Sequence, residues 1–121
     1  MASLRTISRK SGIVTTTDGT QTVLLSFPIP TGAVCSIDAN VVARSSTGDG
    51  ARVEKTQTFR NVGGTITAIG ALLDIVALVT DVSLIGVAVT MAVNGTSVEV
   101  KVTGLIATTI DWFTEITAYI N

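Results

Sequence analysis

Residues 87–103 read VAVTMAVNGTSVEVKVT, and this stretch decides the fold class. Apolar residues occupy every second position from Val87 to Val93 and again from Val98 to Val102, which is the period of strands with one buried face. Between the two runs stands Asn94-Gly95, the dipeptide preferred in a type I′ turn because both central residues of that turn need positive φ. The sequence therefore predicts a β-hairpin with Asn94 and Gly95 at the centre of its turn.

The composition extends this prediction to the whole chain. Val, Ile and Thr supply 48 of the 121 residues, and β-branched side chains lose freedom in helices but pack well on a sheet. Aromatic residues make up only 4% of the chain, so the core must be built mainly from small aliphatic side chains. A chain of this length is expected to form one domain.

Turn residues separate the rest of the chain into strand-sized segments. The segments 72–79 and 85–93 are almost entirely apolar, which is typical of strands buried on both faces; packing on a sheet and on a neighbouring subunit would produce this pattern. The spacing predicts about eight or nine strands in a single-domain, antiparallel β-sandwich or jelly roll. The predicted strands are 12–17, 21–27, 34–45, 51–62, 65–69, 72–79, 85–93, 97–103 and 108–120.

The charge distribution sets the N-terminal segment apart. Residues 1–11 form a basic arm with Arg5, Arg9 and Lys10, whereas the sandwich domain, residues 12–121, is net acidic. Such an arm can be solvated, dock on an acidic neighbour or touch nucleic acid, and three charges without aromatic residues do not favour nucleic acid. Only 14% of all residues are charged, which favours a surface covered by other subunits over a compact monomer with a Thr- and Ser-rich surface.

The chain offers little for catalysis. It has no histidine and one cysteine, Cys35, which is in phase with apolar neighbours and is expected to be a buried, inert thiol. The best pair of carboxylates is Asp111 and Glu115, which share a face of the last predicted strand next to Trp112; a sugar-hydrolysing site and an exposed strand face are both compatible with them. No metal-ligand spacing or phosphate loop is present, so we predict a non-enzymatic protein without cofactor or metal.

Three further features bear on partners. Phe113 and Tyr119 fall on the face of the last predicted strand opposite its apolar side chains, and we expect them to contact another subunit. The loop Ser46–Gly50 is expected to be flexible and could recognise a ligand. The apolar stretch 62–93 contains Asp74 and Asp81, which would be costly inside a bilayer, so buried strands explain it better than a membrane span.

The order of several motifs resembles a small β-sandwich domain of tailed-bacteriophage virion proteins. These motifs are Val42-Ala43-Arg44, Asn61-Val62-Gly63-Gly64-Thr65, Val98-Glu99-Val100-Lys101-Val102-Thr103-Gly104 and Ile110-Asp111-Trp112. Because such a domain fills nearly this whole chain, the resemblance implies a capsid decoration (cement) protein on the outer surface of the virion. Its partners would be the major capsid protein, contacted by Arg5, Arg9 and Lys10, and its own copies in a homo-oligomer, with a trimer favoured. The alternative is a tail-fibre module that binds a host-surface ligand through Ser46–Gly50.

Overall fold

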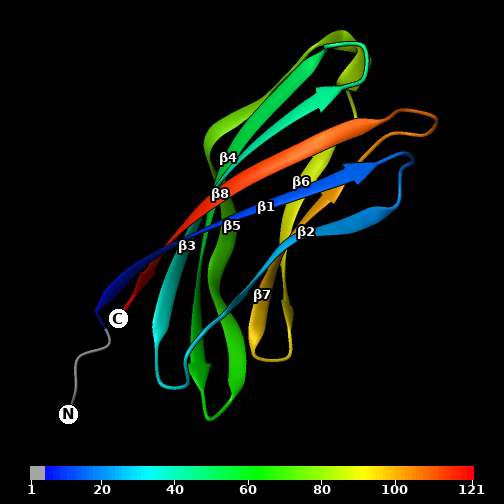
Figure 1. The fold of residues 1–121 in the computed structure, drawn as a ribbon. Coiled ribbons are helices and arrows are strands. Elements are labelled where there is room, and N and C mark those ends of the chain that lie inside the picture. Colours follow the sequence, from blue (N-terminus) through cyan, green and yellow to red (C-terminus); the bar gives the residue numbers. More distant parts are fainter. Residues whose placement is uncertain (1–4) are drawn as a thin grey trace.

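In a computed structural model, residues 5–121 are described and form two antiparallel β-sheets that pack face to face (Figure 1). The predicted all-β sandwich is confirmed. The eight strands of this part are β1 (Thr6–Thr16), β2 (Gln21–Pro28), β3 (Val34–Ser45), β4 (Gly50–Val62), β5 (Thr65–Thr80), β6 (Ala88–Asn94), β7 (Ser97–Thr103) and β8 (Ile110–Ile120). One turn of 3-10 helix, Val82–Leu84, follows β5.

The two sheets differ in width. One has five strands in the order β1-β8-β3-β4-β5, and the other has three strands in the order β2-β7-β6. The chain crosses between the sheets after β1, β2, β5 and β7, and Figure 1 shows β2, β7 and β6 together on one side of the wider sheet. β1 lies along β8 with Thr6 opposite Ile120, so the two ends of the described chain lie side by side.

The core lies between the sheets and is filled mainly by small aliphatic side chains, as the composition predicted. β3 and β8 are central strands whose residues alternate between buried and exposed, because one face meets the core and the other meets solvent. Three of the large aromatic residues, Phe27, Phe59 and Trp112, are buried in this core. Phe113 and Tyr119 are half exposed on the opposite face of β8, as their phase along the strand predicted.

The N-terminal segment takes part in the wider sheet. β1 pairs with β8 along its whole length, from Thr6 to Thr16, so the expected boundary between a basic arm (1–11) and the sandwich domain (12–121) falls inside a strand. Residues 1–4 of the expected arm lie outside the described residues. Backbone pairing begins at Thr6 because β8 continues to Ile120 and offers hydrogen-bonding partners that far.

The hairpin between β6 and β7 is present, but its turn is displaced by one residue from the prediction. Asn94 pairs with Ser97, so the two central residues are Gly95 and Thr96. Only Gly95, with φ 61°, has a positive φ in this turn, which is the requirement of a type II′ rather than a type I′ turn. The Thr96 carbonyl accepts a 3.1 Å hydrogen bond from the Ile29 N–H that follows β2, a contact that local sequence does not encode.

β5 is the element that departs most from expectation. The predicted strands 65–69 and 72–79 are one strand, which continues through Gly70 with φ 79° and shows three irregularities in its register with β4. Within this chain the segment 72–79 is not buried on both faces, because most of its side chains are exposed; its cover by a neighbouring subunit stays a prediction. The physical reason is the unequal width of the sheets: β5 is the last strand of the wider sheet. The segment 85–93 begins as a strand only at Ala88.

Candidate functional site

The outer face of the five-stranded sheet carries an apolar cluster on three neighbouring strands. Phe113 of β8 lies opposite Ile13 of β1 on one side and opposite Val42 of β3 on the other. These side chains face away from the core because they alternate with buried residues such as Trp112. Ile13 is 78% exposed, Phe113 50% and Val42 46%, so the cluster presents apolar surface to its surroundings.

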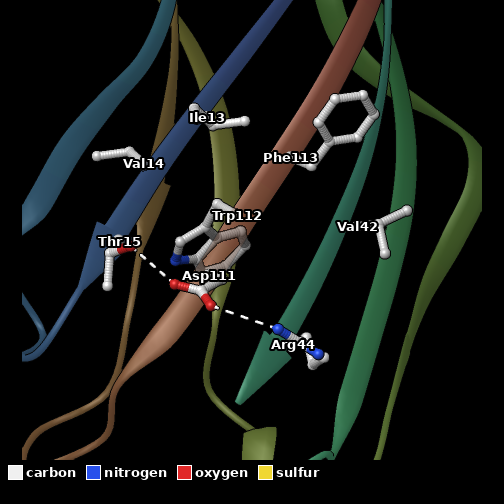
Figure 2. Close-up of a pocket in the computed structure, with 8 residues that line it drawn as sticks. All are labelled: Ile13, Val14, Thr15, Val42, Arg44, Asp111, Trp112 and Phe113. Carbon is white, nitrogen blue, oxygen red and sulfur yellow. Dashed lines mark hydrogen bonds and ion pairs between the residues drawn. The ribbon is translucent and has the colours of Figure 1, made fainter. Parts of the chain in front are cut away.

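A row of polar side chains borders this cluster. Asp111 accepts a 2.7 Å hydrogen bond from the Thr15 hydroxyl, and its other carboxylate oxygen lies 3.7 Å from an Arg44 guanidinium nitrogen (Figure 2). The ion pair is exposed to solvent and therefore contributes little to stability. The apolar cluster and the polar row, with Val14 and Trp112, line a groove of about 440 Å³. We call it the Phe113 groove.

Tyr119 lies on the same outer face but not in the same patch. It is opposite Ile7 of β1, and both side chains are exposed. Tyr119 is six positions from Phe113, a separation of about 20 Å along a strand, and the polar residues Glu115 and Thr117 lie between them on the face. The two residues predicted to contact other subunits therefore belong to two separate surfaces.

The three basic residues of the predicted arm are also separated. Arg9 is on the outer face of β1, in phase with Ile7 and opposite in direction to Lys10. Lys10 extends over β2, where its ammonium donates a 2.6 Å hydrogen bond to the Ser26 carbonyl. Arg5 precedes β1 and lines a groove next to Tyr119. The fold thus distributes these charges over two faces and one end of the sheet.

The geometry of the carboxylates does not fit a glycosidase pair. Asp111 and Glu115 share the outer face of β8, and four residues along a strand separate their Cα atoms by about 13 Å. Because side chains on one strand face project in nearly the same direction, their carboxyl groups lie farther apart than the roughly 5–9.5 Å of a catalytic pair. Asp111 is already bound to Thr15 and Arg44. Trp112 is buried on the opposite face of β8, so it offers no surface on which a sugar could stack beside these acids.

The loop Ser46–Gly50 is held by a local network of hydrogen bonds. The Asp49 backbone N–H donates to the Ser45 hydroxyl, and the Asp49 carboxylate accepts a 2.6 Å hydrogen bond from the Ser83 hydroxyl. The Gly50 N–H donates to the Asp81 carboxylate at 2.8 Å. These bonds attach the loop to the segment after β5, so the loop has fewer groups available for a ligand than its sequence suggested.

A second apolar surface lies along β5 and the segment that follows it. Seven aliphatic side chains, each 41% to 85% exposed, form what we call the β5 surface: Ile69, Leu73, Ile75, Leu78, Val79, Val82 and Ile85. Sequence analysis explained the near absence of charge in this stretch by packing on a sheet and on a neighbouring subunit, but it named none of these side chains as part of an interaction surface. The low total charge of the protein was the signal that pointed toward a covered surface.

Other functional groups are scarce in the described part of the chain. Among residues 5–121, no three His, Cys, Asp or Glu side chains gather into a group that could hold a metal ion. No helix in the same range is long and apolar enough to cross a membrane. Cys35 is fully buried, and burial raises the pKa of its thiol to about 11, so the expected buried thiol is present and its reactive thiolate form is disfavoured.

No family model and no curated protein sequence matches this chain. The solved structures that match this chain include two phage tailspike proteins. The tailspike protein of Acinetobacter baumannii phage AM24 matches 93% of this chain with a TM-score of 0.52 and 12% sequence identity. Tailspike protein gp49 of A. baumannii bacteriophage Fri1, described as a capsular polysaccharide depolymerase, matches 92% with a TM-score of 0.47 and 15% identity. This chain spans 25% and 17% of those chains, respectively.

Proposed function

We propose that the protein is a non-enzymatic structural module of a tailed-phage virion, of the type found in tail spikes and fibres. The observation that carries the proposal is the similarity in fold between 93% of this chain and one part of the AM24 tailspike. The motifs that resemble phage virion sandwiches support the same assignment independently. Because this chain spans a quarter of that tailspike, the activities of whole tailspikes are not transferred to it.

The surface of the domain supports a role in assembly rather than catalysis. Exposed apolar residues gather at the Phe113 groove, around Tyr119 and on the β5 surface, and large exposed apolar patches are typical of interaction sites. The candidate catalytic pair, Asp111 and Glu115, has unsuitable spacing. We therefore propose that the domain acts as a homo-oligomer, with Phe113 and Tyr119 at contacts between subunits.

Quantitative mass spectrometry of purified particles tests the proposal, with the number of copies measured against the major capsid protein. A handful of copies per particle is expected for a tail spike or fibre module. About one copy per capsid subunit would instead identify a capsid decoration protein on the outer head surface, since the head lattice offers that many sites. Absence from washed particles would overturn the assignment to the virion.

The predicted capsid contact through Arg5, Arg9 and Lys10 has its own test within this scheme. Lys10 is already bound to Ser26, so Arg9→Ala is the cleanest single change. If the protein decorates the phage head through these residues, Arg9→Ala should reduce its binding to heads that lack it, and the binding should depend on salt concentration. A tail module would show no such loss, and Arg60→Ala on the exposed outer side of β4 serves as a matched control.

A further inference from the structure

The β5 surface lies on an edge strand of the wider sheet, and this strand lacks the features that usually keep an edge strand from associating with another chain. Edge strands are commonly protected by charged side chains or proline, but between Thr65 and Val87 the only charged residues are Asp74 and Asp81. The Asp74 carboxylate lies 3.1 Å from the Lys55 ammonium, and Asp81 accepts the hydrogen bond from Gly50. Both carboxylates are therefore engaged by β4, and they give this edge little of the charge that usually protects an edge strand.

The irregular register of β5 indicates which kind of contact could cover this edge strand. Three register shifts against β4 bend and twist a strand, which makes it a poor template for adding another strand through backbone hydrogen bonds. Its aliphatic side chains are exposed on both faces instead. Packing of side chains against an apolar surface would bury them without regular backbone pairing.

The size of the β5 surface fits a protein interface. At roughly 180 Å² for a fully exposed aliphatic residue, its seven members present on the order of 700 Å² in total, counted over both faces of β5 and the segment after it. A contact that enclosed this edge would bury an area close to the roughly 800 Å² that each partner contributes to a stable interface. The acids Asp74 and Asp81 of this segment lie beside Lys55 and Arg52 of β4, so the surface has no excess of positive charge to attract anionic lipid headgroups or nucleic acid. An apolar protein surface is the remaining match.

The same chain carries such a surface nearer the other edge of the sheet, and the two surfaces approach each other where Val42 of the groove and Val79 of β5 line one pocket. The Phe113 groove spans β1, β8 and β3, whereas β5 is the far edge. In a head-to-tail contact, the β5 surface of one copy would cover the groove of the next, and repetition of this contact can close a ring. Pairing of β5 with β5 would leave the groove uncovered.

We propose that the β5 surface is an interface with a second copy of this chain, seated in the Phe113 groove of that copy. The inference deepens the proposed function, on which it rests, by naming the two surfaces that meet. Its test is the oligomeric state of the purified protein, whereas the proposed function is tested on particles. A monomeric protein that is nevertheless present in particles would overturn the interface and leave the function standing.

Sedimentation velocity over about 1–100 μM protein is the first measurement. The unchanged chain is expected to be an oligomer, and Leu73→Asp and Phe113→Asp are each expected to weaken association by about 30-fold or more, as for central interface residues. Val23→Asp changes an exposed residue of the other sheet and should leave association unchanged. A monomeric unchanged chain, or oligomeric Leu73→Asp, would overturn the proposal. If Leu73→Asp does not fold by near-UV circular dichroism, Ile75→Lys replaces it.

Cross-linking distinguishes a head-to-tail contact from a symmetric one. Leu73→Cys and Phe113→Cys proteins are treated with a flexible bismaleimide, separately and as a mixture. The native Cys35 is buried and does not react. Cross-linked dimers are expected only in the mixture, since residue 73 of one copy would meet residue 113 of another. Efficient cross-linking of Leu73→Cys with itself would overturn the head-to-tail arrangement.

Discussion

The indole N–H of Trp112 donates a 2.9 Å hydrogen bond to the hydroxyl of Thr16, a residue 96 positions earlier in the chain. Both residues are buried. The bond therefore satisfies the one polar group of the largest core side chain and attaches the end of β1 to β8. An indole N–H without a partner in such a place would retain its desolvation cost.

Thr16→Val removes this acceptor while keeping the shape of the side chain. We expect the free energy of unfolding to fall by about 1–3 kcal/mol, the cost of an unsatisfied buried donor. Urea denaturation followed by Trp112 fluorescence measures the change. Thr15→Val is the matched control, because Thr15 is exposed and bonds only to the exposed Asp111, and it should change stability by less than about 0.5 kcal/mol.

Asn61 connects two loops at one end of the sandwich. Its buried side-chain amide donates a 2.7 Å hydrogen bond to the Ile29 carbonyl and accepts a 3.0 Å hydrogen bond from the Gly64 N–H. We expect Asn61→Ala to destabilise the protein by about 1–3 kcal/mol, because both partners lose their hydrogen bond. Thermal unfolding compares it with Asn40→Ala, an exposed residue bonded to Arg52. Equal melting temperatures for the two variants would contradict the assigned role of Asn61.

Gly12 marks the closest approach of β1 to β2. A Cβ atom added at this position would lie 2.5 Å from the Leu24 carbonyl oxygen and 3.0 Å from the Leu25 Cβ. Since the nearest obstacle is backbone, Gly12→Ala should force the strands apart and cost about 1–3 kcal/mol of stability. In the turn after β1, Gly19→Ala meets nothing nearer than 3.9 Å and is expected to be neutral in the same denaturation assay.

The Cys35 thiol should report on unfolding. Because burial raises its pKa to about 11 in the folded protein, native protein at pH 8 should react with a thiol reagent only as fast as it opens. Denaturant should expose the thiol and make it react at once. Rapid labelling of native protein would contradict the burial of this residue.

The same pKa shift predicts a dependence of stability on pH. Below the unfolded value near 9.0 the thiol is protonated in both states, so the shift has no effect there. As the pH rises from about 9 toward 11, the unfolded chain loses the proton first, and stability should fall. Cys35→Ala should lack this contribution, so the difference in unfolding free energy between the two proteins should change over this interval.

Local sequence predicted the parts of the fold that depend on local geometry. Alternation assigned Phe113 and Tyr119 to the outer face and Trp112 to the core, because strand geometry alone sets which side a residue faces. The hairpin at Asn94-Gly95 was also predicted from local geometry, namely the alternation of its strands and the preference of this dipeptide for turns. Its central pair is Gly95-Thr96 instead, and the Thr96 carbonyl accepts a hydrogen bond from Ile29, a contact between distant segments that a dipeptide preference does not encode.

The patterns predicted a surface covered by other subunits, but not which side chains of β5 stay exposed within one chain. An apolar run of residues predicts that a strand is buried, but it does not indicate whether the atoms that bury it belong to the same chain. β5 is exposed because the facing sheet has only three strands, and sheet width depends on the pairing of all strands. Likewise, the basic residues appear together in the sequence, yet the pairing of β1 with β8 sends Arg9 and Lys10 to opposite faces.

The pairing of Thr6 with Ile120, and of Val34 with Asn121 through two backbone hydrogen bonds of 2.8 and 2.9 Å, makes the domain insertable. Polypeptide entering before β1 and polypeptide leaving after β8 would emerge at the same pole. The whole sandwich could therefore occupy a surface loop of a host scaffold with only short connectors. A circular permutant that joins residues 121 and 5 and opens the Gly95 turn would place new termini at another hairpin while retaining every core contact.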